Sequence, residues 1–211
     1  MKILFLDTSS SVLHCGLYDN ENAIFEITKL LERDMSKEAL FLIQKKFNEN
    51  NISPSFVEKI ILVNGPGSFT GIRIGATIAK VFAWTLNIPI TTITSLEAIT
   101  ASYNGTSKYI IPLIDARRGF VYGQIFDSLN NPITEPEYIL LDKLVEKVQK
   151  LSDDCRYISN DNLPIVKDEY KLNIKKIVEI YKDKECINPH SIDALYLKLT
   201  EAEENAKNSS C

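Results

Sequence analysis

Short apolar runs separated by polar turns dominate the first half of the chain. Residues 2–7 form the first run and end at Asp7, a pattern typical of a strand buried on both faces of a sheet. Further along, apolar residues recur with helical spacing. The pattern predicts strands at about 12–18, 23–28, 59–63 and 90–93, and helices at 35–49, 70–86 and from 95 onward. This order predicts an α/β fold that opens with an antiparallel meander.

The opening scheme recurs after the polar segment 104–107. Residues 109–115 are again an apolar run that ends in an acid, and Asp115 lies 108 positions after Asp7. The same offset places Asp127 opposite Asp19. Two hairpins can resemble each other by chance, but one gapless offset that aligns both acids favours a duplicated unit. We therefore expect two domains, residues 1–104 and 105–211.

The rest of the second half is more polar. Helical spacing predicts helices at about 141–151, 173–181 and 191–206. The last of these is a candidate to pack back on the first domain.

The segment from Asn64 to Gly75 holds four of the eight glycines. A glycine-rich loop between a strand and a helix can bind anions through its free N–H groups, and Arg73 lies one turn into that helix. The spacing matches neither the dinucleotide-binding fingerprint nor a P-loop. The alternative is a tight turn that starts a packed helix, and the sequence leaves both open.

The helix after this loop carries a stripe of small residues. Gly71, Gly75, Ala79 and Ala83 recur every fourth position. Glycine inside a helix costs roughly 1 kcal/mol relative to alanine, so a close neighbour must offset that cost. The neighbour is either this chain's own core or another subunit, because the helix also carries apolar bulk on its other faces.

Composition narrows the possible functions. Hydrophobic residues make up 45% of the chain and the net charge is −4, which argues against autonomous binding to nucleic acid. No apolar stretch is long enough for a membrane span or a secretory signal. The four cysteines and two histidines are scattered, so we expect no metal site, reduced thiols and a cytoplasmic location.

Asp7 and Asp115 each end a predicted buried strand. Paired carboxylates at such positions could hold Mg²⁺ across a cleft, as in a kinase or ATPase that binds nucleotide between two lobes. Aspartates at strand ends are more often turn formers. The turn 116–119 after Asp115 lacks Ser and Thr, which weakens the nucleotide hypothesis, and neither histidine forms an evident catalytic pair.

Four segments together resemble the TsaB (YeaZ-type) family. These segments are Ile3–Ser9, Asn64–Gly75, Thr94–Ala98 and Ile114–Gly119. The resemblance implies an actin-like (ASKHA) two-lobed α/β fold, made of two ribonuclease-H-like units with mixed sheets. It also implies a non-catalytic paralogue of the TsaD-type transferases.

The resemblance further implies a role in threonylcarbamoylation of the adenosine next to the anticodon, in tRNAs that read A-starting codons. The expected partners are a TsaD-type transferase and a TsaE-type ATPase, with a homodimer when the protein is alone and tRNA reached only through the complex. No cofactor and no catalytic residue are implied. The implied partner-binding residues are Met35, Ala39, Leu42, Ile43, Gly71, Arg73, Ile74, Gly75, Ile78, Ala79 and Phe82. A vestigial nucleotide site would comprise Asp7, Thr8, Ser9 and Asp115.

The chain also departs from the family pattern. Met35-Ser36-Lys37-Glu38 stands where the family usually has His-Ser-Glu, Phe120 replaces an acid, and the late Pro-x-Tyr-Leu-Arg signature is reduced to residues 194–198. A peptidase is the weakest hypothesis, because no nucleophile pair or zinc-ligand set is evident.

Overall fold

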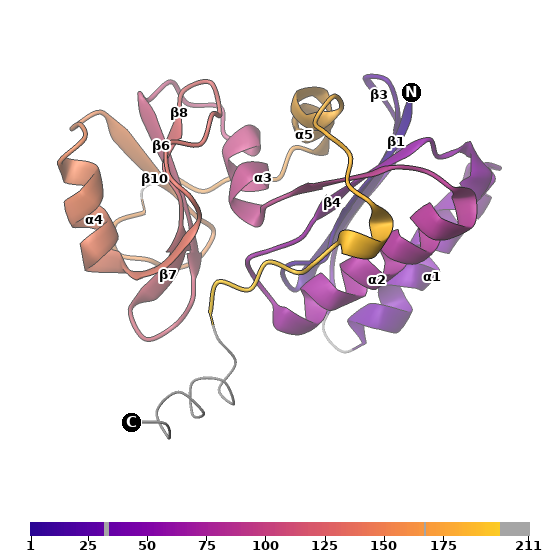
Figure 1. Ribbon diagram of the computed structural model, residues 1–211, viewed down its shortest axis with the longest axis horizontal. Coiled ribbons are helices and arrows are strands. Elements are labelled where there is room, and N and C mark those ends of the chain that lie inside the picture. The colour runs from indigo at the N-terminus through magenta and orange to yellow at the C-terminus, as the bar shows by residue number, and fades with distance from the viewer. Residues whose placement is uncertain (32–33, 167, 199–211) are drawn as a thin grey trace.

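The computed structural model describes residues 1–31, 34–166 and 168–198. Two mixed β-sheets stand side by side, each with helices packed on it, and helix α3 lies between them (Figure 1). The described part of the chain contains no helix that is long and apolar enough to cross a membrane.

The first sheet has the strand order β3-β2-β1-β4-β5, which is a ribonuclease-H-like arrangement. The first three strands pair antiparallel as a meander, and β4 and β5 add in parallel to β1. The strands are β1 (Lys2–Asp7), β2 (Val12–Asp19), β3 (Asn22–Leu30), β4 (Lys59–Val63) and β5 (Ile90–Ile93). All five confirm the sequence prediction.

Alternate residues of β1 point to opposite faces of this sheet. Leu4 and Leu6 pack towards two neighbouring helices, α1 (Met35–Glu49) and α2 (Phe69–Leu86). Ile3 and Phe5 face the other side, where α3 (Ser95–Ser102) and α5 (Ile174–Tyr181) cover them. Both faces of β1 are therefore buried, as its continuous apolar run predicts.

Side-chain caps start the helices of the first sheet. Asp34 accepts a hydrogen bond from the Lys37 backbone N–H at the start of α1, and Thr94 with Glu97 forms a capping box at α3. A short 3₁₀ turn, Pro54–Phe56, links α1 to β4.

The second sheet repeats the first with one strand fewer on its main path. Its order is β10-β6-β7-β9, with β8 paired to β6, and helix α4 (Leu141–Gln149) covers one face. The strands are β6 (Tyr109–Asp115), β7 (Phe120–Gly123), β8 (Phe126–Asp127), β9 (Glu137–Leu140) and β10 (Cys155–Ile158). As in the first sheet, an antiparallel meander is followed by a parallel strand, which confirms the duplicated, two-lobed fold.

The two hairpins differ by one residue in register. Asp7 pairs with His14 in the first sheet, whereas Asp115 pairs with Val121 in the second. The gapless offset of 108 therefore identifies equivalent strands, but residues related by this offset do not have equivalent cross-strand partners in the two sheets.

The C-terminal part of the chain returns to the first sheet. Helix α5 packs on β1, the Ile187 N–H donates to the Ile90 carbonyl, and Ile192 is buried in the core beneath α1 and α2. A division of the chain at residue 104 stays a prediction. That division would put residues 174–198 in the second domain, whereas the structure places them against the first sheet.

The prediction of a helix at 191–206 is wrong for residues 191–198, which the structure describes. A 3₁₀ turn spans Pro189–Ser191, and residues 192–198 form no regular secondary structure. Their backbone is instead tied to the first sheet, since the Leu195 N–H donates to the Asn64 carbonyl and the Asn64 side chain donates to the Asp193 carbonyl. Residues 199–206 lie outside the described part of the chain.

Candidate functional site

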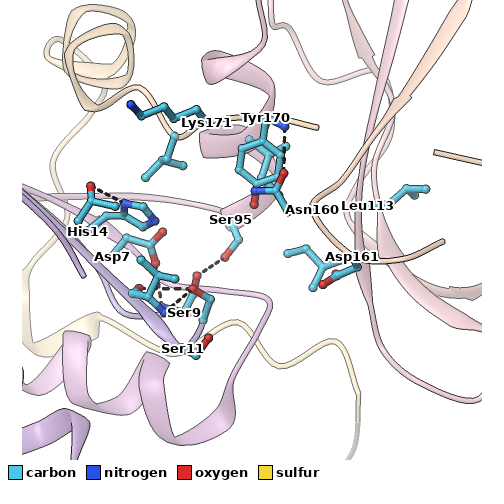
Figure 2. Close-up of a pocket in the computed structure, with 16 residues that line it drawn as sticks. Asp7, Ser9, Ser11, His14, Ser95, Leu113, Asn160, Asp161, Tyr170 and Lys171 are labelled. Atoms are coloured by element: carbon cyan, nitrogen blue, oxygen red, sulfur yellow. Dashed lines mark hydrogen bonds between the residues drawn. The ribbon is translucent and has the colours of Figure 1, made fainter. Parts of the chain in front are cut away.

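A cleft of about 400 Å³ lies between the two sheets, and Figure 2 shows its walls. The end of β1, the turn after it and β2 form one side, and the end of β6 with the turn after β10 forms the other. The lining polar residues are Asp7, Ser9, Ser10, Ser11, His14, Thr28, Ser95, Asn160, Asp161, Tyr170 and Lys171.

Asp7 and His14 are cross-strand neighbours on β1 and β2. The Ser9 N–H donates to Asp7 Oδ1 over 2.8 Å, and His14 Nδ1 lies 3.2 Å from Thr28 Oγ1. Burial raises the pKa of the Asp7 carboxyl, against the opposing effects of the Ser9 N–H and of His14. Burial also lowers the pKa of His14, so the site favours the neutral form of both groups.

The remaining polar groups bind mainly one another. The Ser95 hydroxyl donates to the Ser9 hydroxyl over 3.1 Å, and Asn160 Oδ1 accepts from the Tyr170 N–H over 3.0 Å. Burial, together with the carboxyls of Asp7 and Asp161, raises the pKa of Tyr170. Sequence reasoning missed Asn160, Asp161 and Tyr170, because they come from loops of the second half without any motif.

The four candidates for a vestigial nucleotide site separate in the structure. Asp7 and Ser9 line the cleft, whereas Thr8 is buried against α2, where its hydroxyl donates to the Gly71 carbonyl over 2.7 Å. Asp115 is exposed and does not line the cleft, since its Oδ1 accepts from the Arg117 N–H and so forms a turn. Asp161 is the carboxylate that lines the cleft together with Asp7. A nucleotide site that includes Asp115 stays a prediction.

The cleft offers few ligands for Mg²⁺. Its lining residues include two carboxylates, Asp7 and Asp161, and burial raises the pKa of Asp7 when no cation is bound. Within residues 1–31, 34–166 and 168–198, no group of three or more His, Cys, Asp or Glu side chains could hold a metal ion. The cleft therefore has the chemistry of a polar, hydroxyl-lined pocket.

Replacing Asp7 by asparagine is expected to stabilise the fold at pH 7. The amide oxygen keeps the bond from Ser9. The amide is neutral without binding a proton, so the cost of burying or protonating a carboxylate at pH 7 disappears. Because the folded-state pKa of Asp7 is raised, its contribution to stability is greatest below the unfolded pKa near 3.8 and falls as pH rises through the folded pKa. Urea unfolding should show Asp7→Asn more stable than wild type at pH 7 and similar to it below about pH 4. Lower stability at pH 7 would mean that the charged carboxylate is needed.

The glycine-rich loop is a packed turn. The Ser68 N–H donates to the Ser9 carbonyl, and the Ser68 hydroxyl accepts from the Gly71 N–H as the cap of α2. A Cβ atom on Gly67 would lie 2.2 Å from the Ser9 carbonyl oxygen. These contacts favour the tight-turn interpretation, because the loop holds the chain after β1 rather than an anion.

The small-residue stripe of α2 faces the chain's own sheet. A Cβ atom on Gly71 would lie 2.0 Å from the Thr8 carbonyl oxygen, and one on Gly75 would lie 2.4 Å from Thr8 Oγ1. Ala79 and Ala83 are buried in the same core. The glycines thus allow α2 to approach the end of β1 closely.

Five of the implied partner-binding residues do not lie on the free surface of this chain. They are buried inside the chain because they lie on the helix faces turned towards the sheet: Ala39, Ile43, Gly71, Gly75 and Ala79. Five others are only partly buried: Met35, Leu42, Ile74, Ile78 and Phe82. All of these except Ile74 pack against the core. For the partly buried residues, a role in partner binding stays a prediction.

Arg73 is occupied by the C-terminal segment. Its guanidinium carbon lies 3.9 Å from the centre of the Phe69 ring, and its Nε donates to the Tyr196 hydroxyl over 2.9 Å. Tyr196 also packs on Phe69, with ring centres 4.6 Å apart. Arg73 thus ties residues 193–198 to the start of α2, instead of standing free for a phosphate or a partner carboxylate.

The outer sides of α1 and α2 carry large exposed apolar residues. We define the outer helix face as Leu40 and Phe41 of α1 with Val81 and Trp84 of α2. Trp84 is 73% exposed, and a small cavity of about 180 Å³ lies beside it, lined also by Lys80, Val81, Pro189 and His190. Large apolar side chains that gather on one surface are typical of an interaction site, whereas single ones are common on any protein. Val81 and Trp84 lie together at the small cavity. Val81 and Trp84 belong to the apolar bulk that the sequence placed on the other faces of this helix, whereas helical spacing did not single out Leu40 and Phe41.

The amino-acid sequence is similar to a known family model and to several known proteins. A family model described as "TsaD: tRNA N6-adenosine threonylcarbamoyltransferase" matches residues 27–166. The chain is 28% identical over 221 residues to the tRNA threonylcarbamoyladenosine biosynthesis protein TsaB of Bacillus subtilis, covering 96% of each chain. It is 30% identical over 163 residues to the TsaB of Escherichia coli, covering 73% of this chain and 69% of that protein.

Solved structures support the same fold. A Pseudomonas aeruginosa protein described as similar to the peptidase YEAZ superposes with a TM-score of 0.78 at 18% identity, covering 93% of this chain and 99% of that one. YeaZ from Pseudomonas aeruginosa gives a TM-score of 0.75 with the same coverage. Together with the match of the family model over most of the chain, these similarities show that the chain belongs to the TsaB (YeaZ) family.

Proposed function

We propose that this protein is an accessory subunit in the biosynthesis of threonylcarbamoyladenosine in tRNA. In this proposal it pairs with a TsaD-type transferase through the outer helix face and makes no bond on its own. The TsaB relatives, by their names, take part in this biosynthesis. The single structural observation that carries the pairing is the exposure of large apolar side chains on two neighbouring helices.

The outer helix face supports docking because the fold has already used the opposite sides of both helices. Phe47 of α1 and Phe82 of α2 meet in the core with ring centres 6.3 Å apart. The exposed side chains therefore contribute little to this chain's own packing. Burying them against a second helical protein removes apolar surface from water and stabilises a complex by about 25 cal/mol for each Å² buried.

The cleft supports a non-catalytic role. Phosphoryl transfer depends on charged groups and metal ions that neutralise the phosphates, and nucleophilic catalysis depends on a hydroxyl or thiol hydrogen-bonded to a base. Here Asp7 is buried with a raised pKa, and the hydroxyls of Ser9 and Ser95 bind each other. A TsaE-type ATPase and the transferase would supply the chemistry, with tRNA held chiefly by the transferase. The same helix face would pair two copies of this chain in a homodimer when the transferase is absent.

Depletion of the protein in its native cell tests this proposal. Bulk tRNA is digested and the threonylcarbamoylated nucleoside is quantified by mass spectrometry. We expect the modified nucleoside to fall at least severalfold and to return when the wild-type gene is restored. Unchanged amounts of the four ordinary nucleosides per cell would show that tRNA itself is still made. Unchanged modification after depletion contradicts the proposal.

A further inference from the structure

The second sheet leaves part of one face uncovered. Strands alternate their side chains between faces, and α4 covers the face that carries Val121 of β7 and Ile139 of β9. On the opposite face, α3 packs over Ile110, Phe126 and Ile158 of strands β6, β8 and β10. Among residues 1–31, 34–166 and 168–198, no helix packs on β7 or β9 at that face. Figure 1 shows α3 beside the sheet, higher in the view than the β7 label.

Three aromatic rings occupy the uncovered part, which we name the aromatic face: Phe120, Tyr122 and Tyr138. Phe120 and Tyr138 stack with ring centres 4.6 Å apart and planes within 10°, and Tyr122 lies 5.7 Å from Tyr138. None of the three belongs to a hydrophobic core cluster of the described chain, and all are partly exposed. Aromatic rings arranged on an open sheet face suit the stacking of flat ligands.

One cationic side chain lies beside the aromatic face, and two more belong to the turn that precedes Phe120. The Lys198 ammonium is 5.8 Å from the centre of the Tyr138 ring. Arg117 and Arg118 form the tip of the turn that leads into Phe120, with φ of 68° and 56° in the left-handed region. Within the described residues, neither guanidinium forms a salt bridge.

Two carboxylates belong to the strands that border this face. Glu137 pairs with Lys147 of α4 on the opposite side of the sheet, whereas Asp115 lies in the same turn as the two arginines and accepts from the Arg117 backbone N–H. The aromatic face therefore combines stacked rings with three cationic side chains against one nearby carboxylate, although the whole chain carries −4. A ligand that fits must offer flat rings and negative charge together, and single-stranded RNA offers both.

We infer that the aromatic face binds unpaired nucleobases of an RNA strand, with Arg117, Arg118 and Lys198 near its phosphates. This inference rests on the proposed function, which brings tRNA to the complex, and it adds a direct contact between RNA and this chain. Stacking on Tyr138 supplies most of the affinity, because the negative net charge opposes long-range attraction.

Fluorescence anisotropy with the full-length protein tests the inference. The probe is a labelled RNA hairpin with the sequence of an unmodified anticodon stem and loop, and a fully paired RNA duplex of equal length is the comparison. At low salt and protein concentrations up to the order of 100 µM, the hairpin should bind and the duplex should bind more weakly. Tyr138→Ala should weaken hairpin binding by about tenfold or more, whereas Tyr138→Phe should retain it.

Phe56→Ala is the matched control. Phe56 is also an exposed aromatic residue beside a cation, with the Lys2 ammonium 4.3 Å from its ring centre. It belongs to the turn before β4 of the first sheet and not to the second sheet. This variant should bind the hairpin as wild type does. Arg117→Gln with Arg118→Gln should weaken binding and reduce its salt dependence. Thermal melts of each variant establish that the fold is intact.

The outcomes separate this inference from the proposed function. No hairpin binding by wild type, or equal loss in Phe56→Ala and Tyr138→Ala, overturns the inference. If Tyr138→Ala instead loses co-purification with the transferase while hairpin binding is unchanged, the aromatic face is a protein interface and the inference is again wrong. Co-purification and tRNA modification test the accessory role independently of hairpin binding.

Discussion

Replacing Gly71 by alanine is expected to destabilise the protein by about 3 kcal/mol, which corresponds to a fall of roughly 6–12 °C in Tm. The new Cβ atom would lie 2.0 Å from the Thr8 carbonyl oxygen. That oxygen belongs to the backbone at the end of β1, which cannot rotate away. Either α2 must move off the sheet, or the bond from the Thr8 hydroxyl to the Gly71 carbonyl must break. Calorimetry of the purified variant measures the shift.

Gly119→Ala is the control for this experiment. Gly119 has φ of 78°, and a Cβ atom added there would meet no other atom within 4 Å, so its substitution changes backbone strain alone. We expect a loss of only about 1–2 kcal/mol. If Gly71→Ala is as stable as Gly119→Ala, the close contact between α2 and β1 contributes little. Gly75→Leu should likewise impair folding, so it is unsuitable for separating folding from partner binding.

Trp84→Ala is expected to abolish co-purification with the transferase while the fold is unchanged. Trp84 is 73% exposed, so its truncation should change the free energy of unfolding by less than about 0.5 kcal/mol. Tryptophan at the centre of an interface often contributes about 2 kcal/mol or more, which corresponds to about a 30-fold rise in Kd. Tandem-tag purification followed by titration of the two purified proteins measures this effect.

Leu129→Ala is the matched control for Trp84. Leu129 is 76% exposed and lies in the turn after β8, away from the outer helix face. Both variants remove an exposed apolar side chain, but only Trp84→Ala should weaken pairing. Undiminished pairing in Trp84→Ala, with Val81→Ala also silent, would place the interface on another surface and contradict the proposed docking.

The first sheet could be predicted because its sequence signals are local and strong. The run 2–7, the turn at 19–22 and the helical spacing of 35–49 each match the structure within a few residues. The duplicated hairpin was also evident from one offset. Its one-residue difference in register was not, because pairing depends on the turn geometry of residues 116–119, where two arginines adopt positive φ.

The second half was harder to predict. Strands β9 and β10 have four residues each, and their sequences Glu-Tyr-Ile-Leu and Cys-Arg-Tyr-Ile lack a distinctive apolar run. Residues 191–198 show helical spacing, yet their backbone groups bond to the Asn64 region instead of to one another. In both cases tertiary contacts decide the conformation, and local propensity is only a weak guide.

For the functional surfaces too, local features could be predicted from the sequence, whereas features that depend on tertiary contacts could not. The stripe of small residues on α2 correctly indicated a close neighbour, but the sequence did not identify Thr8 as that neighbour. The exposure of Trp84 depends on which side of α2 meets the sheet. Asp161 reaches the cleft only because β10 adds in parallel to β6, a pairing that no motif indicates.

The buried ammonium of Lys59 has a consequence for how this chain folds during translation. Lys59 lies in β4, and its Nζ donates to the carbonyls of Lys182 and Lys184, more than 120 positions later. Until those residues leave the ribosome, the Lys59 ammonium of a nascent first sheet has only water as its partner, and the apolar side where α5 will pack is uncovered. The N-terminal sheet therefore matures only after nearly the whole polypeptide has been synthesised, and a fragment ending at residue 104 is expected to need chaperone protection.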